Sequence, residues 1–374
     1  MMDLRLIPDP PATESPIGRA LTAMAAGEPV VLIDDRAKVP AGFLVAAAEA
    51  VSTKTVAFLV RHSSGLLCVA LSGSECDRLD LPPMPGAGQS PTQFDACVTV
   101  DAANGIATGI SAHDRARTVA LLAAADSCEG DFTRPGHVIP VRYAAGGVLR
   151  RIGVAEATAD LAQAAGRRPA ALFDAVVGLR RPTELADPCE LREFAESHDL
   201  VTVSVSELIA HRLSLEPLVS RRATTRLPLR AETMHAIGYA TVFGEEEHLA
   251  LVTGDPAGLD DVPVYVHREC LVGDVFGSLR CECRHRLDNA LATITAEGSG
   301  IVVYQKSNSR HTADASSPAQ LSEEELFPFL AANIVQDLGV RSVRLLADQE
   351  PHRNAFRLRG LPTRMHRLAV TAIS

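Results

Sequence analysis

Three cysteines in the second half of the chain are the residues with the clearest chemical potential. They form a Cys-x10-Cys-x-Cys pattern between two histidines: Cys270, Cys281 and Cys283, with His267 before them and His285 after. Thiolate sulfur and imidazole nitrogen are ligands that tetrahedral zinc prefers. Three protein ligands would leave the fourth position to water and would permit hydrolysis of a polarised carbon. A fourth ligand from His285 would instead make a closed, structural zinc site, and both alternatives stay open here.

The elements that position this cluster alternate between strand and helix patterns. We expect strands over 234–241, 248–253, 262–266, 300–304 and 343–346. Helices are expected over 287–296 and over 323–338, the second interrupted by Pro328. The polar stretch 305–319 has no periodicity and is expected to be a loop.

The first half also alternates helices with strands, which favours an α/β or α+β fold. The expected helices are 17–26, 55–61, 115–125, 156–163, 191–198 and 205–212, and the expected strands are 30–33, 65–71, 96–101, 136–141 and 200–204. We expect the arginine-rich segment 214–232 to be a solvated connector that leads into an edge strand. The predicted domains are therefore residues 1–213 and 214–374.

Composition restricts the classes of function. The 374 residues include 36 Lys and Arg against 46 Asp and Glu, a formal charge of −10 that argues against nucleic acid as a partner. No apolar run is long enough for a membrane-spanning helix, and the N-terminal residues lack a signal-peptide pattern. We therefore expect a cytoplasmic protein whose eight cysteines are thiols or metal ligands. A small ligand is favoured over a membrane or a nucleic acid.

The run from Val264 to Cys283 resembles the zinc segment of GTP cyclohydrolase II. It reads Val-Tyr-Val-His-Arg-Glu-Cys-Leu-Val-Gly-Asp-Val-Phe-Gly-Ser-Leu-Arg-Cys-Glu-Cys, and the family reads Arg-Val-His-Ser-Glu-Cys-Leu-Thr-Gly-Asp-Val-Phe-Gly-Ser-Leu-Arg-Cys-Asp-Cys. The resemblance implies a zinc ion held by the three cysteines. It also implies that Glu269 contacts the substrate.

Four segments of the first half resemble 3,4-dihydroxy-2-butanone 4-phosphate synthase. They are Arg-His-Ser-Ser-Gly at 61–65, Thr-Gly-Ile-Ser-Ala-His-Asp-Arg at 108–115, Phe-Thr-Arg-Pro-Gly-His-Val at 132–138 and Ala-Gly-Gly-Val-Leu-Arg at 145–150. The resemblance implies catalysis by His137 and Glu156 on ribulose 5-phosphate with Mg²⁺. It implies substrate binding by Arg134, Asp114 and Arg115.

Together the two resemblances cover nearly the whole chain, in the order found in the bifunctional riboflavin-biosynthesis family. They imply a synthase-like α/β domain followed by a zinc-containing, cyclohydrolase-like α+β domain. They also imply a homodimer.

The chain departs from both families at their catalytic loops. Val39, Ala41 and Phe43 stand where the synthase family has carboxylates, and Mg²⁺ depends on such oxygen ligands. The segment 305–312 lacks the guanine-binding residues of the cyclohydrolase family, and no Asp-x-Arg pair follows it. Asp348 and Glu350 stand where a triphosphate would bind, and their charges oppose such a ligand.

Three hypotheses remain. The leading hypothesis is a protein without the standard activities, either a zinc-containing scaffold that regulates a partner such as an active homologue, or an enzyme with an altered substrate. In the second form, a small phosphorylated sugar or nucleotide is the expected ligand. The alternative is a working synthase and cyclohydrolase of riboflavin biosynthesis.

Overall fold

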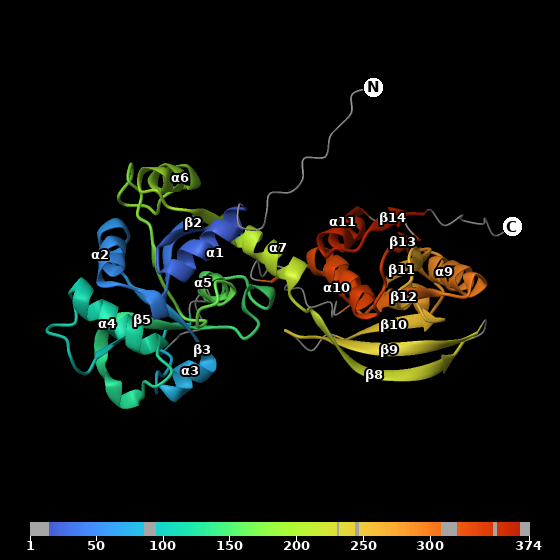
Figure 1. Cartoon of the computed structure of the whole chain (residues 1–374), viewed down its shortest axis with the longest axis horizontal. Helices are drawn as coiled ribbons and strands as arrows, with labels where there is room; N and C mark the ends of the chain where they lie inside the picture. The colour runs from blue at the N-terminus through green and yellow to red at the C-terminus, as the bar shows by residue number, and fades with distance from the viewer. Residues whose placement is uncertain are drawn as a thin grey trace, which may run out of the picture. The chain divides into compact units, whose positions relative to one another are not determined.

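A computed structural model of the chain describes residues 15–85, 95–229, 232–243, 247–307, 320–346 and 350–366. The chain divides into two compact units (Figure 1). The first runs to His211, and the second contains the described residues from Arg212 onward except Gln320. The boundary expected after residue 213 remains a prediction. None of the helices in these ranges is long and apolar enough to cross a bilayer.

A seven-stranded mixed sheet organises the first unit, in the order β4-β5-β3-β6-β2-β1-β7. Its strands are β1 (Val30–Asp34), β2 (Ala41–Ala47), β3 (Cys68–Ser72), β4 (Val100–Ala102), β5 (Phe132–Tyr143), β6 (Ala171–Ala175) and β7 (Thr202–Ser204). Its helices are α1 (Pro16–Ala26), α2 (Thr53–His62), α3 (Gly73–Arg78), α4 (Ala112–Ala123), α5 (Val154–Ala164) and α6 (Pro188–Ser197), with 3₁₀ turns at Ala48–Ala50, Glu129–Asp131 and Gly147–Leu149.

Strand direction decides which loops of the first unit can share a site. β5 runs parallel to β3, and β3 and β2 both run antiparallel to β6. β1 also runs antiparallel to β2. The start of β5 and the ends of β1 and β6 therefore lie at one edge of the sheet. Helices α2, α4 and α6 share a core with the strands that includes Leu59, Leu122 and Phe194.

The second unit contains another seven-stranded sheet, in the order β14-β13-β11-β12-β10-β9-β8. Its strands are β8 (Val219–Pro228), β9 (Thr233–Thr241), β10 (Glu247–Thr253), β11 (Val262–Arg268), β12 (Gly300–Gln305), β13 (Val343–Leu345) and β14 (Thr363–Met365). Its helices are α8 (Leu271–Asp274), α9 (Cys283–Glu297), α10 (Glu323–Asp337) and α11 (Glu350–Leu358), and α7 (Val205–Leu215) contains the change between the units. Ala290 and Ile294 of α9 pack into a core with Val302 of β12.

The two-domain α/β prediction is confirmed, with corrections to individual elements. Most of the expected connector 214–232 is the edge strand β8, whose Arg221, Arg222 and Arg226 are exposed. An edge strand exposed along most of its length lacks the alternation by which strands are recognised. Pro328 lies inside α10 and does not interrupt it. Residues 308–319 of the expected loop lie outside the described ranges.

Candidate active site and metal centre

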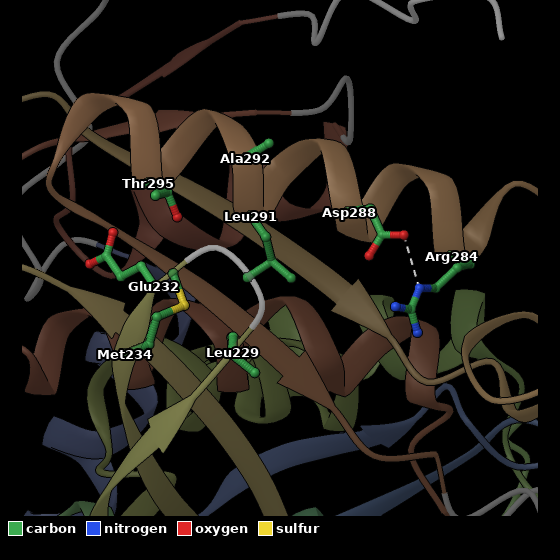
Figure 2. A pocket seen from close by; sticks show the side chains of 8 residues that line it. All are labelled: Leu229, Glu232, Met234, Arg284, Asp288, Leu291, Ala292 and Thr295. Atoms are coloured by element: carbon green, nitrogen blue, oxygen red, sulfur yellow. Dashed lines mark hydrogen bonds and ion pairs between the residues drawn. The ribbon is translucent and has the colours of Figure 1, made fainter.

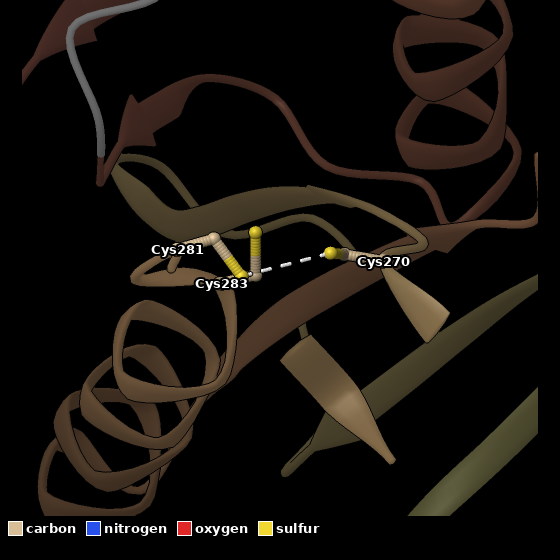
Figure 3. A group of neighbouring side chains, drawn as sticks. All are labelled: Cys270, Cys281 and Cys283. Carbon is tan, nitrogen blue, oxygen red and sulfur yellow. Dashed lines mark hydrogen bonds between the residues drawn. The ribbon is translucent and has the colours of Figure 1, made fainter. Parts of the chain in front are cut away.

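The three cysteines of the second unit come together where β11 leads through α8 to α9 (Figure 3). Their Sγ atoms all lie within 4.8 Å of one another. The Sγ atoms of Cys270 and Cys281 are 3.8 Å apart. Two sulfurs at about 2.3 Å from a tetrahedral zinc ion would lie about 3.8 Å apart, so this spacing suits zinc.

Glycine at position 273 makes room for the thiols. A Cβ there would lie 2.7 Å from Cys281 Sγ, 3.0 Å from Cys283 Cβ and 3.2 Å from Cys270 Sγ. The backbone N–H of Cys283 lowers the pKa of the Cys281 thiol. Burial and the two neighbouring thiols raise the pKa of Cys283 to about 12. The donor set and its cradle therefore fit a zinc ion.

Neither flanking histidine joins the three thiols. His267 is buried, and its Nε2 lies 3.0 Å from Asp274 Oδ1. His285 Nε2 lies 3.1 Å from the side-chain amide of Asn289, one turn along α9. His285, the possible fourth ligand, thus lies outside the cluster. Within the described ranges, the one metal-compatible group contains only the three cysteines. Three ligands leave a coordination position open for water or substrate.

Two cavities of the second unit are lined by residues that adjoin the cysteines in sequence, Glu269 before Cys270 and Arg284 after Cys283. One, of about 350 Å³, has Glu269, Tyr304, Lys306 and Arg222 in its lining. Within it, Glu269 Oε2 accepts the Ser307 N–H at 3.1 Å. The other cavity, of about 220 Å³, lies beside α9, where Figure 2 shows the Arg284–Asp288 ion pair above apolar side chains.

In the first unit, His137 of β5 is held by Asp101 of β4. His137 Nδ1 lies 2.7 Å from Asp101 Oδ2, and the His137 backbone N–H donates to Asp101 Oδ1 at 2.9 Å. The His137 side chain is 38% exposed, whereas that of Asp101 is 9% exposed. The imidazole is therefore fixed on one side and open to a ligand on the other.

Charged and polar groups surround this pair. Asp114, near the start of α4, accepts the Gly109 N–H at 3.1 Å, and Arg115 Nη1 donates to Gly65 O at 3.1 Å. Burial raises the pKa of Asp114, but hydrogen bonds from Ala107, Ser111 and Gly109 hold it below its usual value. Burial lowers the pKa of the Arg115 guanidinium, and the carboxylates of Asp174 and Asp101 oppose this effect.

Asp174 lies beside Arg115 at the end of β6. It accepts hydrogen bonds from the hydroxyls of Ser63 at 2.6 Å and Ser64 at 2.5 Å. Burial raises its pKa, and these bonds only partly oppose the shift. The Arg-His-Ser-Ser-Gly segment thus binds a buried carboxylate through its serines.

Two predicted site residues are not brought to His137. The Arg134 guanidinium donates to carbonyl oxygens of Leu79 at 2.8 Å and Asp80 at 3.0 Å. Glu156 is buried, accepts the Ala144 N–H at 2.7 Å and pairs with Arg151. Ala144 follows the far end of β5, so at about 3.3 Å per residue the backbones of His137 and Ala144 lie roughly 20 Å apart.

The loop that contains Val39, one of the positions where the synthase family has carboxylates, joins β1 to β2. It lies at the same edge of the sheet as His137. Asp34 Oδ1 accepts the N–H groups of Arg36 and Ala37, and Asp35 Oδ1 accepts that of Ser206. Val39 is 77% exposed. Within the described ranges, no group of three carboxylate or histidine ligands gathers here to hold Mg²⁺.

Sequence reasoning missed Asp101 and Asp174. Both are buried acidic residues within strands, Asp101 in β4 and Asp174 in β6. A lone carboxylate at a buried strand position is a signal for a polar partner, because its burial without one is costly. The identity of that partner depended on tertiary pairing.

Comparison with known proteins assigns each half of the chain to a family. Residues 18–211 match the family described as 3,4-dihydroxy-2-butanone 4-phosphate synthase, and residues 220–365 match the family described as GTP cyclohydrolase II. The chain is 44% identical over 360 residues to the riboflavin biosynthesis protein RibBA of Rhodococcus erythropolis, covering 90% of this chain and 85% of the relative. It is 43% identical over 356 residues to RibBA of Nocardia farcinica, covering 90% and 86%.

Solved structures extend this similarity to the fold. RibBX of A. baumannii, a two-domain 3,4-dihydroxy-2-butanone 4-phosphate synthase, is 30% identical with a TM-score of 0.70, covering 90% of this chain and 94% of that one. A 3,4-dihydroxy-2-butanone 4-phosphate synthase in complex with two magnesium ions is 38% identical with a TM-score of 0.50, covering 54% and 97%.

Proposed function

The chain belongs to the bifunctional RibBA family of riboflavin-biosynthesis proteins, and on this premise we propose that it is an enzyme whose first unit acts on a phosphorylated pentose. The substrate is ribulose 5-phosphate, and the reaction is the synthase reaction of the family. A working synthase was part of the alternative hypothesis drawn from the sequence. The identity of 43–44% to RibBA proteins favours this hypothesis over a protein without activity.

The observation that carries the proposal is the fixed imidazole of His137. With Nδ1 beside Asp101, its Nε2 can accept a proton from a carbon adjacent to the substrate carbonyl. Arg115 is 7% exposed, and its Nε finds no hydrogen-bond partner among the described residues. This buried cation stabilises the negative charge that develops when the proton leaves.

The second unit holds zinc through Cys270, Cys281 and Cys283 in this proposal. Zinc with three protein ligands supplies a Lewis acid and an activated water, the chemistry of a hydrolase of the GTP cyclohydrolase II type. Because His285 lies outside the cysteine cluster, the geometry supports an open zinc site over a closed, structural one. Glu269 and Lys306 line the nearby cavity in which a substrate has room to bind.

A second candidate function is a zinc-containing scaffold without the standard activities. It is favoured by the exposed Val39 in the β1–β2 loop, where the synthase family has a carboxylate, and by the use of Asp34 and Asp35 as acceptors for backbone N–H groups. A scaffold of this kind would regulate a partner, such as an active homologue.

Turnover separates the two candidates. Purified full-length protein with its zinc content measured is assayed with ribulose 5-phosphate and Mg²⁺, and separately with GTP. Formation of formate from the pentose, absent in His137→Gln, supports the synthase proposal. No turnover of either substrate by zinc-loaded protein refutes the enzyme proposal and leaves the scaffold.

A further inference from the structure

Asp101 contacts His137 at two points at once. One carboxylate oxygen accepts the backbone N–H, and the other lies 2.7 Å from the ring Nδ1. Two contacts from one carboxylate fix both the position of the residue and the rotation of its ring. Because a carboxylate only accepts hydrogen bonds when ionised, this geometry requires the ring proton on Nδ1.

The backbone at Gly109 packs closely against this pair. Gly109 has a φ of +81°, and a Cβ there would lie 2.2 Å from Asp101 Oδ2 and 2.8 Å from His137 Nδ1. Asp114 holds this loop through the Gly109 N–H. The two strands are also close together beside His137. A Cβ at Gly136 of β5 would lie 1.9 Å from the backbone carbonyl carbon of Val100 of β4.

We propose that Asp101 is a positioning residue that keeps His137 in the Nδ1–H tautomer and directs the Nε2 lone pair toward the ligand. The exposures of the two side chains are consistent with these roles, because Asp101 is covered whereas His137 is 38% exposed and can reach a ligand. The role of Asp101 in the reaction rests on the proposed function. In that reaction the Nε2 lone pair forms the new N–H bond, and the electron pair of the broken C–H bond moves toward the substrate carbonyl.

Nuclear magnetic resonance of the full chain labelled with ¹⁵N-histidine tests the tautomer directly. The ¹⁵N shifts of Nδ1 and Nε2 show which nitrogen carries the proton at alkaline pH, and His137→Gln identifies the signal among the 12 histidines. In Asp101→Asn, the side-chain oxygen can still accept the backbone N–H, but its amide donates to Nδ1. We expect the ring proton to move to Nε2 in this variant.

The matched control is Asp131→Asn, because Asp131 accepts the Cys128 N–H and belongs to the same unit. It should leave the His137 tautomer unchanged. A wild-type His137 with its proton on Nε2 overturns the proposal, even if Asp101→Asn does not fold. An unchanged Nδ1–H tautomer in folded Asp101→Asn also overturns it.

Kinetics separate this inference from the proposed function. If the wild type forms product, Asp101→Asn should lower kcat by about 10²- to 10⁴-fold with KM little changed. An unchanged kcat would refute a role for Asp101 in the reaction. If the tautomer moves as expected but the wild type forms no product, the proposed enzyme function fails and the positioning of His137 by Asp101 stands.

Discussion

Replacement of Gly273 by alanine tests whether the cysteine cluster is built for zinc. The new Cβ would lie 2.7 Å from Cys281 Sγ and 3.0 Å from Cys283 Cβ. Ordinary contact begins near 3.4 Å, so at least one thiol must move by roughly 0.5 to 1 Å, which is a large change when zinc–sulfur bonds are held near 2.3 Å. We expect zinc affinity to fall by about 10- to 100-fold, the range typical of residues that orient metal ligands.

The assay is competition for zinc with a chromophoric chelator, together with zinc content per chain. Gly277→Ala is the control, because no atom lies within 4 Å of its new Cβ, although its φ of +63° carries some backbone strain. This control should keep its zinc while losing a little stability. Equal zinc affinity in wild type and Gly273→Ala would refute the cradle argument.

Two further predictions concern stability. Burial lowers the pKa of His352 to about 4, below its ordinary 6.5, so the folded state loses stability as pH falls from 6.5 toward 4. Between pH 7 and about 4.5, wild type should therefore lose about 2 kcal/mol more unfolding free energy than His352→Gln in urea titrations, and equal losses would contradict this. Glu156→Gln keeps an acceptor for the Ala144 N–H but breaks the buried pair with Arg151, so it should cost about 1 to 3 kcal/mol at neutral pH. A loss below about 0.5 kcal/mol in the same titrations would show that this pair is not structural.

The sequence predicted the cysteine cluster well because its ligands are close in sequence. Cys283 begins α9, Cys281 precedes it by two residues, and Cys270 follows β11, so local structure nearly determines the site. Zinc itself remains a proposal. The place of His285 was harder to predict, because helix spacing directs it toward Asn289 one turn later.

The first-unit site was less predictable because it depends on pairing between distant segments. Asp101 and His137 are 36 residues apart and meet only through the β4–β5 pairing. Glu156 follows His137 by only 19 residues, yet Glu156 of α5 binds Ala144 beyond the far end of β5. Strand β2 was missed because its first residues, Ala41 and Gly42, follow Pro40 and resemble a loop.

The most direct measurement of the central claim is formate release from ribulose 5-phosphate by the full-length, metal-quantified protein, with His137→Gln as the matched variant. We expect turnover by the wild type and loss of turnover in the variant. Absence of turnover in the wild type, with zinc bound and Mg²⁺ present, would contradict the enzyme proposal. Equal turnover in both proteins would contradict the assignment of the reaction to His137.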